Sequence, residues 1–269
     1  SVVYTDETGK ISAGVLPSGV GSTYHNVLDY GAVGDGATDC TAAFTSAIAA
    51  AKASGGRGVV WVPKGLYLVT GNIEAVNVTI LGVGPIDING PQYTGTSVYY
   101  PQGSVVMMTN TANPMFKVGY GAVLDGLTFF YPNQLPTLST PIVYAPTIKG
   151  ADYLSAGDGN FSIKNCLFSN CYDGISIGHF RFPYQYPYLA GRSNVVGSGK
   201  VSVTDCRGYC VNSFMQLVDC YDVVTVRNVQ LSPSWSMNMW AAGVNLFKWT
   251  IRYGQAFKVR WGHMDGLTV

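Results

Sequence analysis

Aspartate provides nearly all the carboxylates with which this sequence could do acid–base chemistry, because the glutamates are only Glu7 and Glu74. Hydrolysis of a glycosidic bond commonly uses two carboxyl groups, one as acid and one as base or nucleophile. Asp173 begins an Asp-Gly-Ile pattern, and Asp219 and Asp222 flank a short turn before an apolar run. We therefore predict these three aspartates as catalytic candidates, although each could instead simply form a turn.

Basic residues offer a second chemistry, in which a sugar loses a proton and a bond is eliminated rather than hydrolysed. Such a lyase needs a basic residue or tyrosine as proton acceptor, a carboxylate neutraliser and often Ca²⁺. The sequence leaves hydrolysis and elimination open, and it predicts no cofactor except Ca²⁺ in the second case. The residues that could serve a lyase are Lys164, His179, Arg181 and Arg207.

The six cysteines indicate buried thiols rather than a metal or redox site. None belongs to a Cys-x-x-Cys pair, the spacing found in many zinc and thioredoxin-like sites. Ser–His–Asp, P-loop and His-Glu-x-x-His patterns are also missing from the sequence. The sequence therefore predicts no metal site. The thiols, which fit folding in a reducing cytoplasm, are Cys40, Cys166, Cys171, Cys206, Cys210 and Cys220.

Two segments, residues 178–200 and 232–251, carry many aromatic side chains outside any regular pattern. Rings with polar edges can stack on sugar rings, and tyrosine and arginine are also enriched where subunits meet. Both interpretations stay open. Trp249 lies in the second segment, and the predicted substrate-binding residues are His179, Arg181, Tyr184, Tyr186, Tyr188, Trp235 and Trp240.

The charge content is low and balanced. The net charge is +1 and only 12% of residues are charged, against about 25% in an average soluble domain. A near-neutral chain argues against nucleic acid as a partner. The apolar runs are too short to span a bilayer and no signal peptide is visible, so no membrane partner is predicted. Apolar surface must therefore be hidden in a long core or between subunits.

A weak internal repeat runs through the second half of the chain. Apolar and polar residues alternate up to an Asn or Asp, which is followed by a small or apolar residue. Successive copies lie 40, 40, 23 and 37 residues apart, and 23 residues suits one coil of a solenoid. Stacked coils would place Cys166 over Cys206 and Cys171 near Cys210. We expect a structural ladder from the repeated residues Asp125, Asn165, Asp205, Asn228 and Asp265.

The most patterned stretch covers residues 27–71. A turn-rich segment with Gly31, Gly34 and Gly36 precedes an alanine-rich helix predicted near residues 39–54. Asp39 suits the N-cap, and Phe44, Ile48 and Ala51 form one apolar face. Two strands should follow at residues 58–62 and 66–69, joined through a Pro-Lys-Gly turn.

This order resembles the start of the pectate-lyase-like parallel β-helix superfamily. There, a turn-rich segment leads into a helix that caps the first coil, and a hairpin-like pair of strands begins the solenoid. The resemblance implies an all-β, right-handed parallel β-helix with an N-terminal capping α-helix. The matching positions are Asp29, Tyr30, Gly31, Ala32, Gly34, Asp35, Gly36, Asp39, Gly55, Gly56, Val60, Val62, Pro63, Gly65 and Tyr67.

The resemblance also divides the chain. We expect a neck or linker in residues 1–26, a first module with the capping helix in 27–70, and the β-helix in 71–269. No closing cap is visible in the sequence, so the β-helix is expected to continue beyond residue 269.

Members of this superfamily include pectin-acting enzymes, exo-glucanases and bacteriophage tailspikes, the last being polysaccharide depolymerases. The resemblance favours a tailspike-type protein that binds a bacterial surface polysaccharide. Whether it also depolymerises that polysaccharide is left open. The alternatives are a non-catalytic receptor-binding or structural fibre and a free-living pectinase- or glucanase-like enzyme. A tailspike implies a virion tail location, an upstream tail partner joined at the N-terminus, and a homotrimer. Apolar residues in 105–108 and 223–226 suggest strands buried on both faces, which a trimer would satisfy.

Overall fold

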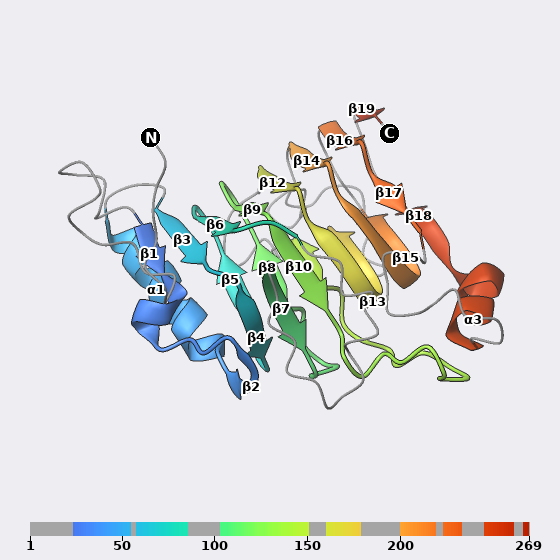
Figure 1. Cartoon of the computed structure of the whole chain (residues 1–269). Coiled ribbons are helices and arrows are strands. Elements are labelled where there is room, and N and C mark those ends of the chain that lie inside the picture. Colours follow the sequence, from blue (N-terminus) through green and yellow to red (C-terminus); the bar gives the residue numbers. More distant parts are fainter. Residues whose placement is uncertain are drawn as a thin grey trace, which may run out of the picture.

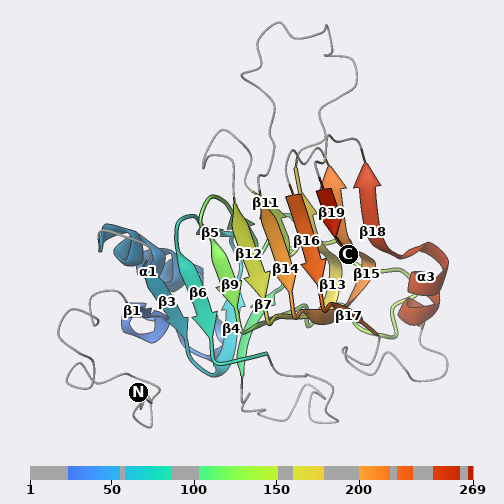
Figure 2. The same cartoon turned by 90° about the horizontal axis from the view of Figure 1, so that it is seen from above.

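The computed structural model describes residues 24–54, 58–85, 103–150, 160–178, 200–218, 223–232, 245–260 and 266–268. Within these ranges the chain winds through successive coils whose strands stack side by side in two parallel sheets (Figure 1). Figure 2, viewed from above, shows strands of neighbouring coils lying next to one another along the whole stack. The predicted all-β parallel β-helix is confirmed in this form, whereas its right-handed sense stays a prediction.

The first sheet has eight strands, and each successive member comes from the next coil of the chain. All the pairs are parallel and in continuous register, for example Ile80 with Leu124 and Ile163 with Val203. The strands are β1 (Tyr24–Asn26), β3 (Val59–Val62), β6 (Thr79–Gly82), β9 (Val123–Asp125), β12 (Phe161–Lys164), β14 (Val201–Thr204), β16 (Val223–Arg227) and β19 (Gly266–Thr268). The strand β1 lies at the end of the expected neck, so the stack already includes residue 24.

The second sheet has eleven strands and bends along its length. Early coils supply two short strands each, whereas β13 (Leu167–Ile177) and β15 (Arg207–Val218) run through both parts without a break. The early strands are β2 (Asp35–Asp39), β4 (Gly65–Val69), β5 (Ile73–Ala75), β7 (Ser104–Met108), β8 (Phe116–Val118), β10 (Leu127–Phe130) and β11 (Ile148–Gly150). The last coil adds β17 (Gln230–Leu231) and β18 (Gln255–Arg260).

The expected hairpin-like pair of strands is wrong in one respect. The strands β3 and β4 follow one another in sequence, but β3 pairs with β1 and β6 while β4 pairs with β2 and β7. Pro63 and Lys64 therefore turn the chain from one sheet into the other. The physical reason is that a coil buries its apolar residues between the sheets, which a flat hairpin could not do.

The helix α1 (Thr41–Ala53) forms where the sequence predicts it, at the end of the stack that holds β1 and β3 (Figure 1). Its buried residues include Phe44, Ile48 and Ala51, and the Phe44 ring meets the ring of Tyr67 edge-on at 5.9 Å. These contacts join the helix to the main hydrophobic core. Its function as a cap stays a prediction. A short 3-10 helix, η1 (Val27–Tyr30), precedes it.

The N-cap assignment needs correction. Cys40 occupies the N-cap position, and its side chain makes no capping hydrogen bond. Asp39 instead accepts hydrogen bonds at Oδ1 from the backbone N–H groups of Thr41, at 3.0 Å, and Thr70, at 3.2 Å. Its Oδ2 accepts from Thr70 Oγ1 at 2.6 Å. Asp39 thus ties the start of α1 to the end of β4, which is a tertiary role that capping preferences alone do not reveal.

Asp39→Asn should lower the free energy of unfolding by about 1 kcal/mol at neutral pH, a typical cost for a weakened cap. Burial alone would raise the pKa of Asp39, but hydrogen bonds from Thr41 and Thr70 outweigh it and lower the pKa. Because the folded-state pKa is lowered, this stabilisation is present above the ordinary carboxyl pKa and is lost as the pH falls through the lowered value. Urea unfolding from neutral to strongly acidic pH should therefore show the gap between variant and parent closing. Glu74→Gln, at an exposed carboxylate on β5, is the control, and a gap independent of pH would contradict this role.

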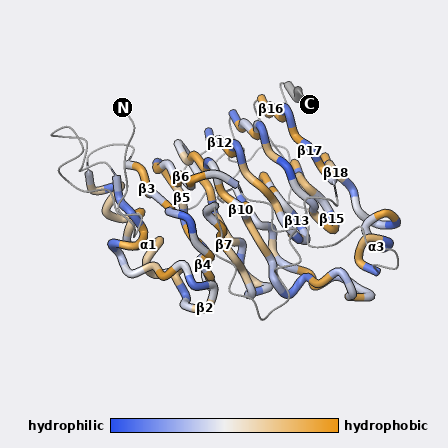
Figure 3. Tube along the Cα trace, in the orientation of Figure 1, coloured by the Kyte–Doolittle hydropathy of each residue, from blue (hydrophilic) through white to orange (hydrophobic). Residues whose placement is uncertain are grey.

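A row of phenylalanine rings runs along the inside of the stack. Phe116, Phe129, Phe168, Phe214 and Phe257 come from successive coils, with neighbouring ring centres 5.0 to 6.1 Å apart. Figure 3 shows the accompanying alternation of apolar and polar residues along the strands. Phe129 and Phe168 stand opposite one another in register, whereas the other rings come from different positions of their coils. Stacked coils thus bring apolar side chains of neighbouring coils into one continuous core.

The predicted ladder of Asn and Asp residues is confirmed in part. Asn165, Asp205 and Asn228 all have left-handed backbone conformations, with φ of 50°, 55° and 52°. Asn228 Nδ2 donates to Asp205 Oδ1 at 2.7 Å across one coil. Asp125 does not belong to this column, because it stands opposite Lys164 in register and Gly126 takes the left-handed turn. Asp265 lies outside the described residues.

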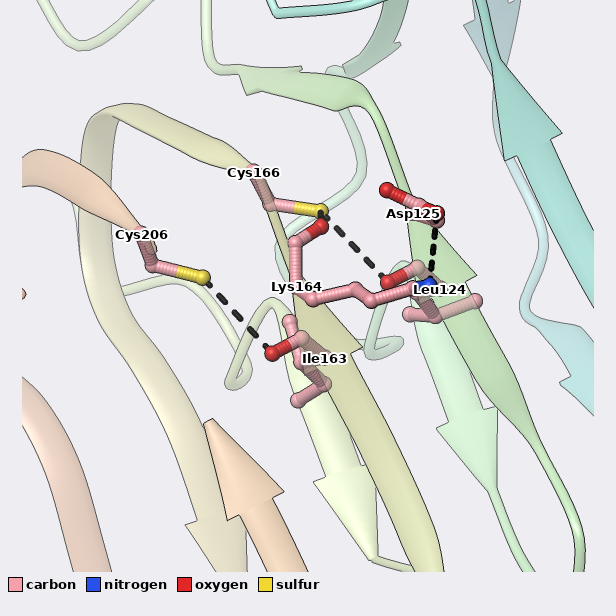
Figure 4. A network of polar contacts seen from close by, with 6 residues as sticks. All are labelled: Leu124, Asp125, Ile163, Lys164, Cys166 and Cys206. Carbon is pink, nitrogen blue, oxygen red and sulfur yellow. Dashed lines mark hydrogen bonds and ion pairs between the residues drawn. The ribbon is translucent and has the colours of Figure 1, made fainter. Parts of the chain in front are cut away.

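The cysteine alignment is confirmed. Cys171 stands opposite Cys210 in the second sheet. Cys166 and Cys206 direct their thiols at the carbonyl oxygens of Leu124 and Ile163, each at 3.8 Å (Figure 4). Burial raises the pKa of the Cys166 thiol well above its ordinary value. Cys166, Cys171 and Cys206 are buried and pack inside the coils, and the cysteines of the described ranges are free.

The two apolar strands behave differently from one another. All five residues of β7 are buried within one chain, because Val105, Met107 and Phe130 form a second small cluster outside the main core. In β16 only Val224 and Val226 are buried, while Val223 and Arg227 are exposed. The strand β7 therefore requires no second subunit to cover it, whereas β16 leaves Val223 exposed. Among the described residues, no helix is long and apolar enough to cross a membrane.

Candidate functional site at the bend of the second sheet

Asp173 is the catalytic candidate that falls within the described part of the chain. It lies in β13, next to the bend of the second sheet, and only 8% of its surface is exposed. Asn170 makes this bend with a left-handed φ of 59°. The remaining predicted catalytic and substrate-binding residues lie outside the described residues: Asp219, Asp222, His179, Arg181, Tyr184, Tyr186, Tyr188, Trp235 and Trp240.

The next coil holds the Asp173 carboxylate in place. Asp173 Oδ1 accepts hydrogen bonds from Asn212 Nδ2, at 2.8 Å, and from Ser213 Oγ. The register between β13 and β15 shifts here, so that Ser213 stands opposite Asp173. Asn212 and Ser213 both belong to a stacked strand, so the alignment of the coils fixes the position of the carboxylate.

Two further side chains extend this group into a network. Lys258 Nζ, on β18, donates to Asn212 Oδ1 at 2.8 Å. Gln216 Nε2 donates to Ser213 Oγ at 2.8 Å. We call Asp173, Asn212, Ser213, Gln216 and Lys258 the Asp173 network. The network crosses three successive coils. Within it, the Asn212 amide lies between the Asp173 carboxylate and the Lys258 ammonium group.

The backbone of Asp173 is also anchored, on the side of the preceding coil. Its carbonyl oxygen accepts from the N–H of Thr147 at 2.9 Å and from Thr147 Oγ1 at 3.0 Å. Thr147 Oγ1 in turn accepts from the buried hydroxyl of Tyr131 at 3.1 Å. Asp173 is therefore fixed from both neighbouring coils, which limits the reorganisation that would be needed in a reaction.

A second lysine lies in the row of residues that includes Lys258. Lys149 stands opposite Ser176, Ser176 opposite Gln216, and Gln216 opposite Lys258. Lys149 Nζ donates to Ser176 Oγ at 3.3 Å and to the carbonyl oxygen of Gly178 at 2.8 Å. The face beside Asp173 thus carries two half-buried ammonium groups, which favour an anionic or strongly polar ligand.

The groups beside Asp173 are poor nucleophiles and bases. Burial, followed by the Asp173 charge, raises the pKa of the Tyr172 hydroxyl. Burial raises the pKa of the Cys210 thiol well above its ordinary value. Both stay protonated at neutral pH. Asp173 is therefore the group in this network that can accept a proton, and Lys258 supplies positive charge.

Neither described residue of the possible lyase set lies beside Asp173. Lys164 lies in the first sheet and forms an ion pair with Asp125 at 3.1 Å (Figure 4). Arg207 begins β15 and stands opposite Leu167, not Asp173. His179 and Arg181 are outside the described residues. Within the described residues, no cluster of three or more His, Cys, Asp or Glu residues could hold a metal ion.

Sequence reasoning proposed Asp173 as a candidate but did not name the four other members of the Asp173 network. The echo between the segments starting at Cys171 and Cys210 already placed Asn212 and Ser213 one coil from Asp173. That signal could have identified both. No comparable signal exists for Lys258, because β18 follows the helix α3 (Asn245–Tyr253) and shares no repeat motif with β15.

The comparisons with known proteins support the fold assignment. Residues 24–117 match the family model described as rhamnogalacturonase A/epimerase, pectate lyase-like. Mannuronan C5-epimerase AlgE3 of Azotobacter vinelandii is 49% identical over 67 residues, which are 22% of this chain and 4% of that protein. Alginate lyase 7 of the same organism is 47% identical over 68 residues, covering 22% and 8%. The chain therefore matches only a small part of these relatives.

Solved structures extend the similarity over most of the chain. The tailspike protein gp49 of Acinetobacter baumannii bacteriophage Fri1, a capsular polysaccharide depolymerase, has a TM-score of 0.52 and 16% identity. The alignment covers 87% of this chain and 41% of gp49. The Agl-KA catalytic domain has a TM-score of 0.50 and 15% identity, covering 90% and 36%. At such identities the likeness shows a shared fold. Residues 24–117 therefore resemble a pectate lyase-like family model, and the strands of the described residues stack as a parallel β-helix.

Proposed function

We propose that this protein binds and depolymerises a bacterial surface polysaccharide, as a tailspike-type protein of a bacteriophage virion. The observation that carries the proposal is Asp173, a buried carboxylate that two side chains of the next coil hold in place and that an amide links to Lys258. Buried, positioned carboxylates are costly to maintain without a function. The shared fold with a capsular polysaccharide depolymerase agrees with this proposal.

In this proposal Asp173 exchanges a proton with the sugar, and the lysines bind its charged or polar substituents. Oδ1 is occupied by Asn212 and Ser213, which leaves Oδ2 to meet the substrate. Lys258 and Lys149 would contact a uronate or another anionic group. A second carboxylate for hydrolysis, or a base for elimination, would come from Asp219, Asp222, His179 or Arg181.

The test is to incubate the purified protein with capsular polysaccharides and O-antigens from a panel of bacterial hosts. Released reducing ends report hydrolysis or elimination, and ultraviolet absorbance of unsaturated uronate products reports elimination alone. Binding is measured on the same panel by biolayer interferometry. Binding without release from any glycan would establish the rival function, a non-catalytic receptor-binding fibre. If the protein neither binds nor cleaves any glycan of the panel, the proposal is wrong.

The proposal includes a homotrimer on the virion tail, joined to an upstream tail component through the N-terminal segment. Its support is the fold shared with a phage tailspike. The strand β7 adds no support, because all five of its residues are buried within one chain. Light scattering at micromolar concentration checks the trimer. A mass that stays at 28.7 kDa at every concentration would remove it, and would favour the free-living pectinase- or glucanase-like enzyme.

A further inference from the structure

The helix α3 (Asn245–Tyr253) packs against β15 directly beside the Asp173 network. Leu246 is buried in a cluster with Tyr209 and Val211. Thr250 Oγ1 accepts from the Tyr209 hydroxyl at 2.6 Å. The ring of Trp249 lies 6.3 Å from that of Tyr172, the neighbour of Asp173 in sequence. In Figure 1, α3 lies at the far end of the stack from α1, next to β18.

Contacts at both ends hold α3 in place. At its start, the N–H of Leu246 donates to the carbonyl oxygen of Pro136 at 3.2 Å. At its end, the N–H of Gly254 donates to the carbonyl oxygen of Thr250 at 2.7 Å, which closes the last turn of the helix itself. A Cβ on Gly254 would lie 2.8 Å from the carbonyl oxygen of Val211, so the glycine permits a close approach to β15. The helix is thus a rigid element rather than a free arm.

Tyr253 is the residue of this helix that its docking does not explain. Its ring packs on Trp249, with ring centres 5.1 Å apart, yet 52% of its surface is exposed. The guanidinium of Arg252 lies 5.4 Å from the centre of the Tyr253 ring. An exposed aromatic face beside an exposed guanidinium combines an apolar surface with several hydrogen-bond donors.

The position of Tyr253 connects it to the Asp173 network. Only Gly254 separates it from Gln255, which stands opposite Ser213 in register. Gly254 touches Val211, the residue before Asn212. The aromatic face and the carboxylate therefore lie on neighbouring parts of the same bend, and one extended ligand could reach both.

We propose that Tyr253, supported by Trp249 and Arg252, is a sugar-stacking subsite that binds a pyranose ring of the polysaccharide next to Asp173. This inference rests on the proposed function. The flat face formed by ring C–H groups would lie on the Tyr253 ring, while Arg252 donates hydrogen bonds to the hydroxyls. Stacking of this kind does not depend on the charge of the sugar. The subsite therefore contributes binding affinity and the alignment of the polysaccharide along the site, and it takes no part in the reaction.

The test measures binding of the polysaccharide that the parent protein binds best in the host panel, together with turnover. Tyr253→Ala should weaken binding by about tenfold, a typical contribution of one aromatic contact. Tyr253→Leu should weaken it similarly, because leucine fills the space beside Trp249 without a ring face. Tyr253→Phe should bind as the parent does. Tyr120→Ala, at a tyrosine that is 49% exposed in another part of the stack, is the matched control.

The outcomes separate the two proposals. Parent-like binding by both Tyr253→Ala and Tyr253→Leu, with Asp173→Asn still impairing the site, would overturn the subsite alone. A panel in which the parent binds no glycan would overturn both proposals. Thermal unfolding of each variant shows whether α3 remains docked. If Tyr253→Ala unfolds early, Tyr253→Leu decides the outcome.

Discussion

Asp173→Asn should reduce the rate of polysaccharide cleavage by at least about a hundredfold, the lower end of what a positioned proton-transfer group contributes. Asparagine has nearly the same shape, and its Oδ1 can still accept hydrogen bonds from Asn212 and Ser213. Asparagine carries an amide nitrogen in place of Oδ2, so it cannot accept or donate a proton there as the carboxyl group does. The loss should therefore appear in kcat, measured from released reducing ends, while the thermal unfolding temperature stays close to that of the parent.

Asp205→Asn provides a matched control for this substitution. Asp205 also accepts a side-chain hydrogen bond from the next coil, from Asn228 at 2.7 Å, but it belongs to the structural ladder. Its left-handed backbone, with φ of 55°, suits asparagine equally well. Its variant should keep full activity. Unchanged cleavage by a folded Asp173→Asn protein would remove Asp173 from the reaction and leave it a structural role.

Gly174→Ala should destabilise the protein by about 3 kcal/mol, at the upper end of the usual cost of overpacking. A Cβ at this position would lie 2.5 Å from the carbonyl oxygen of Phe214 and 3.0 Å from Cys210 Sγ. Backbone cannot yield as a flexible side chain can, so β13 and β15 would have to move apart. Because Asp173 is the preceding residue, its contacts with Asn212 and Ser213 should weaken as well. Urea unfolding and glycan binding measure the two effects.

Gly31→Ala separates steric crowding from backbone strain. Gly31 has a φ of 92°, and a Cβ there would meet nothing within 4 Å. Only the left-handed conformation opposes alanine, so the expected cost is about 1 kcal/mol, without any effect on glycan binding. Equal stability losses in the two variants would contradict a tight contact between the coils at Gly174.

Local sequence patterns were sufficient for most of the fold. The alanine-rich segment, with its apolar face of Phe44, Ile48 and Ala51, forms α1 close to the expected bounds. The recurrence of Cys166 at Cys206 placed two strands one coil apart, since stacked coils repeat the same side-chain environment. One error arose where a single residue changes the position of the turn. Asp125 was placed in the ladder because its neighbours resemble those of Asn165, but Gly126 takes the left-handed position.

The sequence alone predicted the parallel coils and the stacking of the cysteines, because these depend on residues close together in the chain or repeated along it. It also singled out Asp173 as a candidate, and the catalytic role of Asp173 remains a proposal. Only the tertiary structure decided which groups surround Asp173. Lys258, which reaches Asp173 through Asn212, follows a helix that breaks the repeat, and Tyr253 ends that helix. Their approach depends on how non-repeating segments dock on the stack. That docking reflects buried contacts such as Leu246 with Val211, which have no counterpart in the periodicity of the chain.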